Sequence, residues 1–313
     1  MCGGGVLGTP LGDHSGASMS QIANAVADIR SSKTWTQRIY YISPLLEGLL
    51  KAGVNLAKRS TGKGALANQA MSAGVERHNR AALAALRING DTTTIRSGPF
   101  AGMRYLTTST GSLLGPKIIG RYEEEIAGWV QTAIGADYDT VLDIGSAEGY
   151  YAVGMAYANP RLKVVAYDVD PRSREMVAEL ARLNDVAERV EVRDYCDHAE
   201  LQRRISEGGR TLVIVDIEGF ENDLLDPANV PALFQADMIV ELHEQARPGV
   251  SMRTCNRFVG SHEIDLASAK RDETKIAEAI LSGMEPAIAT AAAPEGRGLP
   301  QLWLRLTSSR ASS

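Results

Sequence analysis

At residues 141–149 the chain reads VLDIGSAEG, an apolar run that leads into two glycines with three residues between them. The apolar run is typical of a buried strand, and Gly145 and Gly149 indicate a tight turn where a ligand can approach the backbone. This strand and turn predict a nucleotide-like ligand that contacts Gly145, Ser146 and Gly149. Taken alone the turn is also compatible with a purely structural role in any α/β protein.

A second strand, VVAYDVD at residues 164–170, places Asp168 about twenty residues beyond the turn, where a carboxylate can accept both hydroxyls of a ribose. An NAD-binding turn would normally read G-x-G-x-x-G, whereas Ser146, Ala147 and Glu148 follow Gly145 here. The pair therefore favours S-adenosylmethionine over NAD. A helix N-cap or loop position is the structural alternative for Asp168. Asp143 is expected to bind a cationic amino-acid moiety or to cap a helix.

Strand-like and helix-like segments alternate regularly after residue 135, which is typical of a parallel sheet covered on both faces. The strands read TVLDIG, VVAYDV, RVEV, LVIVDI and MIVEL, and HEIDLASA and QLWLRL follow late in the chain. Asp170 followed by Pro171, and Asp197 followed by Glu200, predict helix starts. We expect an α/β, Rossmann-like, doubly wound seven-stranded sheet that ends in an antiparallel pair with a reversed last strand.

The chain divides into three expected regions. Residues 1–19 are predicted to form a disordered tail, and residues 20–90 a helical N-terminal region. Residues 91–313 are predicted to form the Rossmann-like domain, with a β-hairpin at 91–108, a helix at 118–134 and the core at 118–306. The Ala-rich apolar helices of the second region predict a homodimer.

Composition restricts the classes of partner. Lys and Arg total 33 against 38 Asp and Glu, so the charge gives no reason to expect nucleic acid. The three scattered cysteines predict neither a disulfide framework nor a zinc cluster. The apolar segment 39–57 is interrupted by Pro44, Glu47 and Lys51, so no membrane span is predicted. Without a secretory signal pattern at the N-terminus, a cytoplasmic location is expected.

Four motifs follow one another within residues 118–306: VLDIGSAEGYYAV, VVAYDVDP, VDIEGFENDLL and MIVELHE. In these motifs and in their order the chain resembles the FkbM family of class I S-adenosylmethionine-dependent methyltransferases. The resemblance implies a Rossmann sheet with a reversed seventh strand, S-adenosylmethionine as methyl donor, and O-methylation of a small molecule or sugar. The chain departs from the common family pattern at residues 146–148 and at Phe220, so the substrate class is not fixed by the resemblance.

Four polar residues follow the fourth and fifth strands of the expected sheet. Asp216 and Glu218 lie two apart, as do Glu241 and His243, and a period of two directs each pair to one side. If the strands are neighbours, all four converge at the carboxyl edge, where ligands bind in this architecture. His243 is the expected general base, because an unperturbed imidazole titrates near neutrality. In the alternative, Asp216 and Glu241, with His243, bind Mg²⁺.

Structural roles compete with each of these assignments, since Glu218 can cap a helix and His243 can bond within a loop. Asp194 and Tyr195 follow the third strand, where the adenine is expected, and Asp216 is a further cofactor contact. Glu123 and His262 are additional candidates near the pocket. Besides an O-methyltransferase acting on a small-molecule hydroxyl, two other functions fit: a non-catalytic S-adenosylmethionine-binding or scaffold protein, and a nicotinamide-dependent oxidoreductase.

Overall fold

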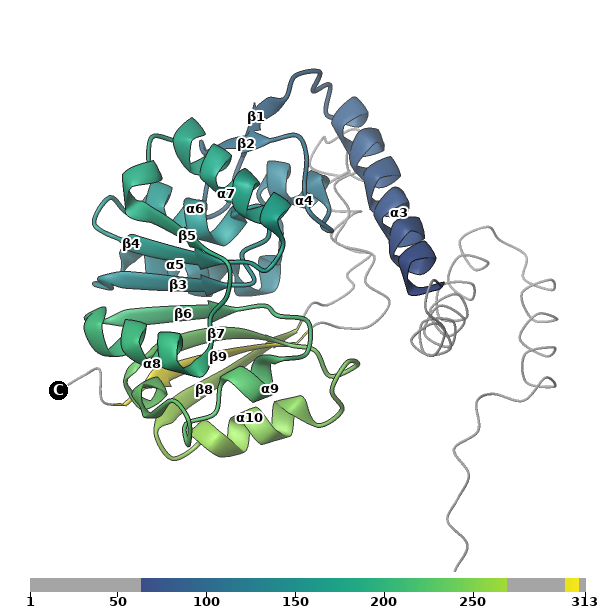
Figure 1. Ribbon diagram of the computed structural model, residues 1–313. Coiled ribbons are helices and arrows are strands. Elements are labelled where there is room, and N and C mark those ends of the chain that lie inside the picture. The colour runs from purple at the N-terminus through teal and green to yellow at the C-terminus, as the bar shows by residue number, and fades with distance from the viewer. Residues whose placement is uncertain (1–62, 269–301, 310–313) are drawn as a thin grey trace, which may run out of the picture. The chain divides into compact units, whose positions relative to one another are not determined.

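The computed structural model describes residues 63–268 and 302–309 and contains one large mixed sheet (Figure 1). The chain separates into two compact units, residues 1–69 and 70–313, and the sheet belongs to the second. Its strands are β3 (Thr140–Ile144), β4 (Lys163–Tyr167), β5 (Val190–Arg193), β6 (Thr211–Val215), β7 (Asp237–Leu242), β8 (His262–Ser268) and β9 (Leu302–Ser308). The strand order is β5-β4-β3-β6-β7-β9-β8.

Only one of the seven strands is reversed. β9 pairs antiparallel with both β7 and β8, whereas the pairs from β5 to β7 are all parallel. This arrangement confirms the predicted Rossmann-like seven-stranded sheet with a reversed last strand. The sheet forms from uninterrupted apolar runs because both of its faces are covered, and every residue of β3, β6 and β7 is buried.

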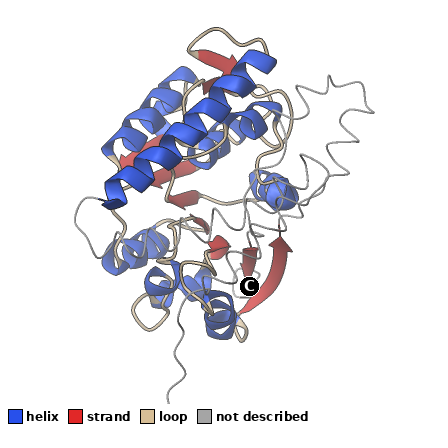
Figure 2. Cartoon of the chain, turned by 90° about the vertical axis from the view of Figure 1, so that its right-hand side faces the viewer, coloured by secondary structure: helices blue, strands red, loops and turns tan. Residues whose placement is uncertain are grey.

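Successive side chains of a strand enter two separate cores. Val141 packs on one face with α5 (Ala127–Gly135), α6 (Tyr150–Ala158) and α7 (Pro171–Leu183). Leu142 packs on the other face with α8 (His198–Glu207) and α10 (Val250–Phe258), and α9 (Glu221–Leu224) joins that core through Leu224. Figures 1 and 2 show these helices on both sides of the sheet. Asp170 and Asp197 cap α7 and α8 as the sequence predicts.

The segment before the sheet differs from the single helix expected at residues 118–134. It consists of α4 (Leu114–Ile119), a 3-10 turn (Glu124–Ile126) and α5. The break occurs at Gly120, whose φ of 79° is left-handed and ends α4. A Cβ on Gly120 would lie 1.8 Å from the carbonyl oxygen of Ser97, so this close approach requires glycine.

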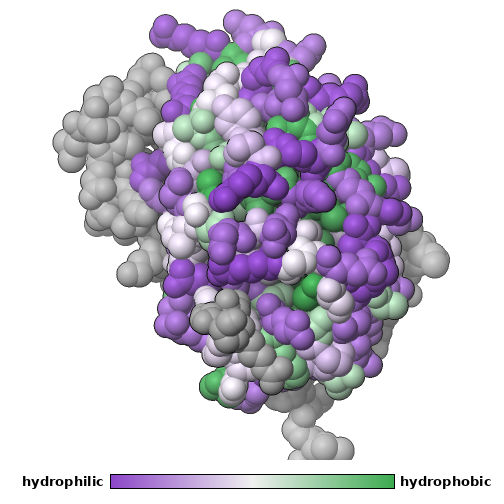
Figure 3. Space-filling model, turned by 90° about the vertical axis from the view of Figure 1, so that its left-hand side faces the viewer, coloured by the Kyte–Doolittle hydropathy of each residue, from purple (hydrophilic) through white to green (hydrophobic). Residues whose placement is uncertain are grey.

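Two elements precede this segment. α3 (Lys63–Ala85) lies in the region for which helices are expected, and β1 (Thr92–Thr94) pairs antiparallel with β2 (Arg104–Leu106) within the expected hairpin. The expected tail, the rest of the helical region and residues 269–301 lie outside the described residues. Among the helices that the structure describes, none is long and apolar enough to cross a membrane. The face drawn in Figure 3 is predominantly hydrophilic, with its hydrophobic residues in small, separate areas.

Candidate functional site

The candidate site lies at the carboxyl edge of the sheet, where β4 and β6 flank β3 on opposite sides. This is the switch point at which open α/β sheets bind ligands. Gly145 leaves β3 there with a φ of 91°, and a Cβ on it would lie 1.7 Å from the carbonyl oxygen of Asp216. The turn between β3 and α6 is therefore packed directly against the end of β6. Gly149 ends the turn with a φ of 98° and begins α6.

Asp168 holds this turn from the neighbouring strand. Its Oδ2 accepts a hydrogen bond from the Ala147 backbone at 2.8 Å, and its Oδ1 accepts one from the Asp170 backbone at 2.8 Å. Burial raises the pKa of the Asp168 carboxyl above its usual value, and the two backbone donors oppose that effect. The Asp168 carboxylate thus connects the end of β4 with the glycine turn that follows β3. Each of its oxygens has a second lone pair that can accept a hydrogen bond from a ligand hydroxyl.

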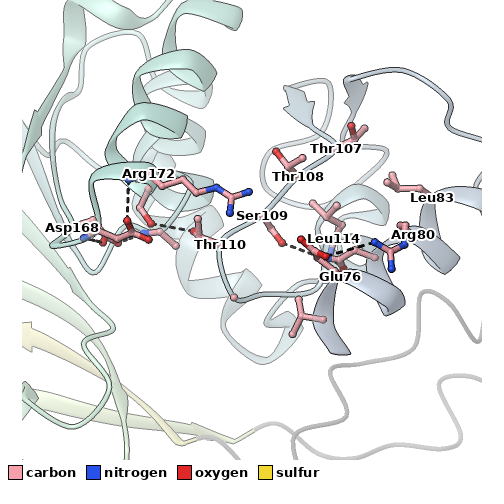
Figure 4. Close-up of a pocket in the computed structure, with 16 residues that line it drawn as sticks. Glu76, Arg80, Leu83, Thr107, Thr108, Ser109, Thr110, Leu114, Asp168 and Arg172 are labelled. Carbon is pink, nitrogen blue, oxygen red and sulfur yellow. Dashed lines mark hydrogen bonds and ion pairs between the residues drawn. The ribbon is translucent and has the colours of Figure 1, made fainter. Parts of the chain in front are cut away.

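A cavity of about 530 Å³ opens beside Asp168 and Ala147. Its walls are α3, the hydroxyl-rich loop 107–111 and the start of α7. Figure 4 shows the Arg172 side chain extending from α7 toward Ser109 on the opposite wall. The volume is in the range that holds a small-molecule ligand.

Two further cofactor candidates are buried beneath the turn. Asp143 is 3% exposed, and burial, with Asp216 adding to it, raises the pKa of its carboxyl to about 7 while the backbone amide of Ala152 lowers it. That amide lies in the first turn of α6, which begins after Gly149. Among the described residues, neither Asp143 Oδ2 nor Ser146 Oγ has a hydrogen-bond partner.

The four polar residues expected at the ends of β6 and β7 do converge. The Nε2 atom of His243 lies 3.5 Å from Asp216 Oδ1, 3.4 Å from Glu218 Oε2 and 3.8 Å from Glu241 Oε2. Val215 pairs with Val240 in the sheet, so the residues that follow them, Asp216 and Glu241, lie side by side at the carboxyl edge. Single donor atoms of Asp216, Glu241 and His243 all lie within 4.8 Å of one another. Glu218 is mostly exposed and does not cap α9.

Glu221 completes this cluster and was not predicted from the sequence. Its fully buried side chain lies 2.6 Å from His243 Nδ1 and accepts a hydrogen bond from the Gly219 backbone. A carboxylate cannot donate, so the proton of a neutral imidazole stays on Nδ1, and Nε2 presents a lone pair to the other three carboxylates. The spacing Asp216-x-Glu218-x-x-Glu221 was the available signal, but only the intervening turn brings Glu221 to the histidine.

The charges around His243 favour a positive charge in the cluster. Burial lowers the pKa of the imidazole, but the hydrogen bond to Glu221 and the carboxylates of Asp216 and Glu218 outweigh it and hold the pKa above its usual value. Four carboxylates lie within 4 Å of one ring. Such a group can take a proton from a reacting hydroxyl or bind a cation.

A buried ion pair fixes the turn from the other side. Glu148 accepts from Lys117 Nζ at 2.5 Å and from the Tyr105 hydroxyl at 2.9 Å, and the backbone of Thr110 donates to it at 3.2 Å. Both charged side chains are buried. Burial alone would raise the pKa of Glu148, but Lys117 holds it below its usual value. Sequence reasoning gave no role to either residue.

The remaining candidates take separate positions. Asp194 and Tyr195 follow β5, and Tyr195 is 66% exposed. Glu123 is buried and accepts a hydrogen bond from the Tyr151 hydroxyl. His262 does not join the other candidates: it begins β8, at the amino end of that strand, and its Nε2 bonds the Ala236 carbonyl.

No family model matches the chain, and no curated protein matches it either. Among solved structures, it is similar to the O-methyltransferase TomG from Streptomyces achromogenes in complex with SAM, with 18% identity over 57% of this chain and 77% of that chain and a TM-score of 0.38. An O-methyltransferase from Bacillus cereus in complex with SAH has 13% identity over 55% and 74%, with a TM-score of 0.38.

An RNA methyltransferase from Salinibacter ruber in complex with S-adenosyl-L-homocysteine has 21% identity over 33% of this chain and 64% of that chain, with a TM-score of 0.26. All three likenesses have low identity and low TM-scores. The fold assignment therefore rests on the strand order of the chain itself.

Proposed function

We propose that this protein is an S-adenosylmethionine-dependent methyltransferase of the FkbM type that methylates a hydroxyl of a small molecule or sugar. The observation that carries the proposal is the junction of Asp168 with the glycine turn at the switch point of the sheet. The Asp168 carboxylate suits the ribose of an adenosyl ligand, and Gly145 leaves the turn without a side chain that would obstruct it. The buried carboxyl of Asp143 suits the cationic amino-acid end of the same ligand. Asp194 and Tyr195 are the proposed adenine contacts, and a cytoplasmic location and a homodimer also remain proposals.

S-adenosylmethionine, when bound, supplies an electrophilic methyl group. The chain must orient an acceptor hydroxyl in line with that group and receive its proton. The cluster of Asp216, Glu218, Glu241 and His243 is the group that performs this task in our proposal. Glu221 positions the ring of His243, so that Nε2 rather than Nδ1 faces the reacting side.

Calorimetric titration tests the cofactor assignment. The purified chain is titrated separately with S-adenosylmethionine and with NAD. We expect heat with S-adenosylmethionine only, and we expect Asp168→Ala to weaken binding at least tenfold. Glu179→Gln, which removes an exposed carboxylate from the same helix that follows Asp168, is the matched control and should bind normally. Binding of NAD alone would replace the proposal with an oxidoreductase.

A panel of hydroxyl acceptors then tests catalysis. Transfer of a labelled methyl group to any hydroxyl compound supports the proposed reaction. Tight cofactor binding without transfer to sugars, phenols or aliphatic alcohols would instead indicate the non-catalytic binding protein.

A further inference from the structure

We propose that Asp216, Glu241 and His243 bind a divalent transition-metal ion such as Mn²⁺ in preference to Mg²⁺, and that Glu221 is the outer carboxylate that orients the histidine ligand. Binding of the ion does not depend on the proposed methyl transfer, whereas its chemical role rests on it.

The spacing of the donor atoms carries the first step. Two ligand atoms that are each about 2.1 Å from one ion lie about 3.0 to 4.2 Å apart, for angles between 90° and 180°. His243 Nε2 is 3.5 Å from Asp216 Oδ1 and 3.8 Å from Glu241 Oε2. Both distances fall in this interval, and both exceed the length of a good hydrogen bond. The third pair, Asp216 with Glu241, lies within 4.8 Å. Small side-chain adjustments, without a rearrangement of the strands, would therefore bring all three atoms around one ion.

The histidine supplies a second, independent observation. Its side chain is 9% exposed, and its Nε2 atom faces the carboxylates of Asp216 and Glu241 while Nδ1 lies 2.6 Å from Glu221. A carboxylate that bonds the far nitrogen of a metal-binding histidine fixes its tautomer and raises its basicity. Among the described residues, Asp216 Oδ1 is also buried without a hydrogen-bond partner. His243 Nε2 and Asp216 Oδ1 therefore face the same point, and a bound cation would take the place of a proton on Nε2.

The donor set decides between ions. Mg²⁺ prefers an octahedron of oxygen atoms and keeps several waters, whereas an imidazole nitrogen is a better ligand for transition metals. One buried nitrogen with two carboxylates therefore favours Mn²⁺ or Zn²⁺ over the magnesium ion that the carboxylates alone would suggest. The three donor atoms also lie next to the turn between β3 and α6, because Gly145 of that turn packs against the backbone of Asp216.

The ion would act on the acceptor hydroxyl. When bound, the ion would lower the pKa of that hydroxyl as a Lewis acid, and the exposed carboxylate of Glu218 would accept the proton and pass it to water. In the proposed transfer the deprotonated oxygen would form a bond to the methyl carbon as the carbon–sulfur bond breaks, with S-adenosylhomocysteine as the leaving group. This sequence balances without an oxidant or reductant.

Manganese binding to the full-length chain without S-adenosylmethionine tests the site, because free Mn²⁺ is measured directly by its electron paramagnetic resonance signal. We expect one ion per chain, at least tenfold weaker binding in His243→Asn, and ten- to hundredfold weaker binding in Glu221→Gln. Glu179→Gln should bind as the unaltered chain does. Zn²⁺ should displace Mn²⁺ at equimolar concentration, and Mg²⁺ should need at least a tenfold excess.

Circular dichroism melts identify any variant that fails to fold, and Asp216→Asn, at a partly exposed position, provides a third test of the same ligand set. No manganese binding, equal competition by Mg²⁺, or binding unchanged in both His243→Asn and Asp216→Asn would overturn the proposal. Loss of S-adenosylmethionine binding with manganese binding intact would instead remove the methyltransferase assignment and leave the metal site standing.

Discussion

Replacement of Asp143 by asparagine should make the chain more stable at alkaline pH. Burial raises the pKa of the Asp143 carboxyl to about 7, and the nearby Asp216 adds to this effect. Asparagine keeps an oxygen that accepts the hydrogen bond from the Ala152 backbone, and it removes the group that ionises. The substitution therefore separates the charge of Asp143 from its hydrogen bond with the Ala152 backbone.

The sign follows from the two states of the chain. An unfolded Asp loses its proton near pH 3.9, whereas the folded chain keeps it until about pH 7. The stabilisation that protonated Asp143 contributes is complete below the unfolded pKa, and it is lost as the pH rises toward the folded pKa. Between pH 5 and the folded pKa of about 7 the unaltered chain loses about 1.36 kcal/mol of stability per pH unit. The loss between pH 5 and pH 8 is therefore about 3 kcal/mol. The Asp143→Asn variant has no such loss, because its amide does not ionise.

Urea denaturation at pH 5 and pH 8 measures the effect. The free energy of unfolding of Asp143→Asn relative to the unaltered chain should increase by about 3 kcal/mol between the two pH values, whereas Glu179→Gln should show no such increase. A difference that stays constant within about 0.5 kcal/mol would refute the reasoning, since it would mean that Asp143 is already ionised in the folded chain at pH 5. Because S-adenosylmethionine carries a positive sulfonium, its binding near pH 7 should also release protons from the unaltered chain.

Three further substitutions test the turn and the cluster. Gly145→Ala places a Cβ 1.7 Å from the Asp216 carbonyl oxygen at a residue with a left-handed φ, so calorimetry should detect no S-adenosylmethionine binding. The control Gly128→Ala in α5, where a Cβ would meet nothing within 4 Å, should bind normally. Lys117→Met leaves Glu148 as an uncompensated buried charge and should lower the free energy of unfolding, measured by urea denaturation, by about 3 to 5 kcal/mol. Addition of Glu148→Gln should recover part of that loss, and a double variant as unstable as the single one would contradict this explanation. His243→Ala should leave the Kd for S-adenosylmethionine within about threefold and lower turnover at least a hundredfold; a parallel loss of cofactor binding would show that His243 acts on the cofactor instead.

The fold could be predicted because its strands are encoded locally. Parallel strands that are covered on both faces are apolar throughout, so β3, β6 and β7 are visible as short apolar runs without any knowledge of their partners. The interruption at Gly120 could not be predicted in this way. It depends on the Ser97 carbonyl, which approaches the glycine from a loop more than twenty residues earlier in the chain.

The same distinction separates the expected site residues from those that were missed. Asp216, Glu241 and His243 converge because parallel strands end at one edge and side chains alternate with a period of two. Glu221 lies beyond the end of the strand. It reaches His243 only because Glu218 and Gly219 take positive φ values of 55° and 105° and fold the chain back over the edge. Local pattern does not specify that turn, so the orienting carboxylate became visible only in three dimensions.

Glu148 links these observations to the departure of the turn from the common family pattern. A buried charged side chain inside this turn would be costly if it were unpaired, but Glu148 is bonded to Lys117, Tyr105 and the backbone of Thr110. Thr110 in turn contacts Ser173 at the start of α7, and both residues line the cavity beside Asp168. The residue that differs from the pattern therefore attaches the preceding segment to the turn. A ligand bound beside Asp168, as we propose, would contact a wall whose position depends on the Lys117–Glu148 pair, so the stability of that pair and the affinity for the ligand should change together.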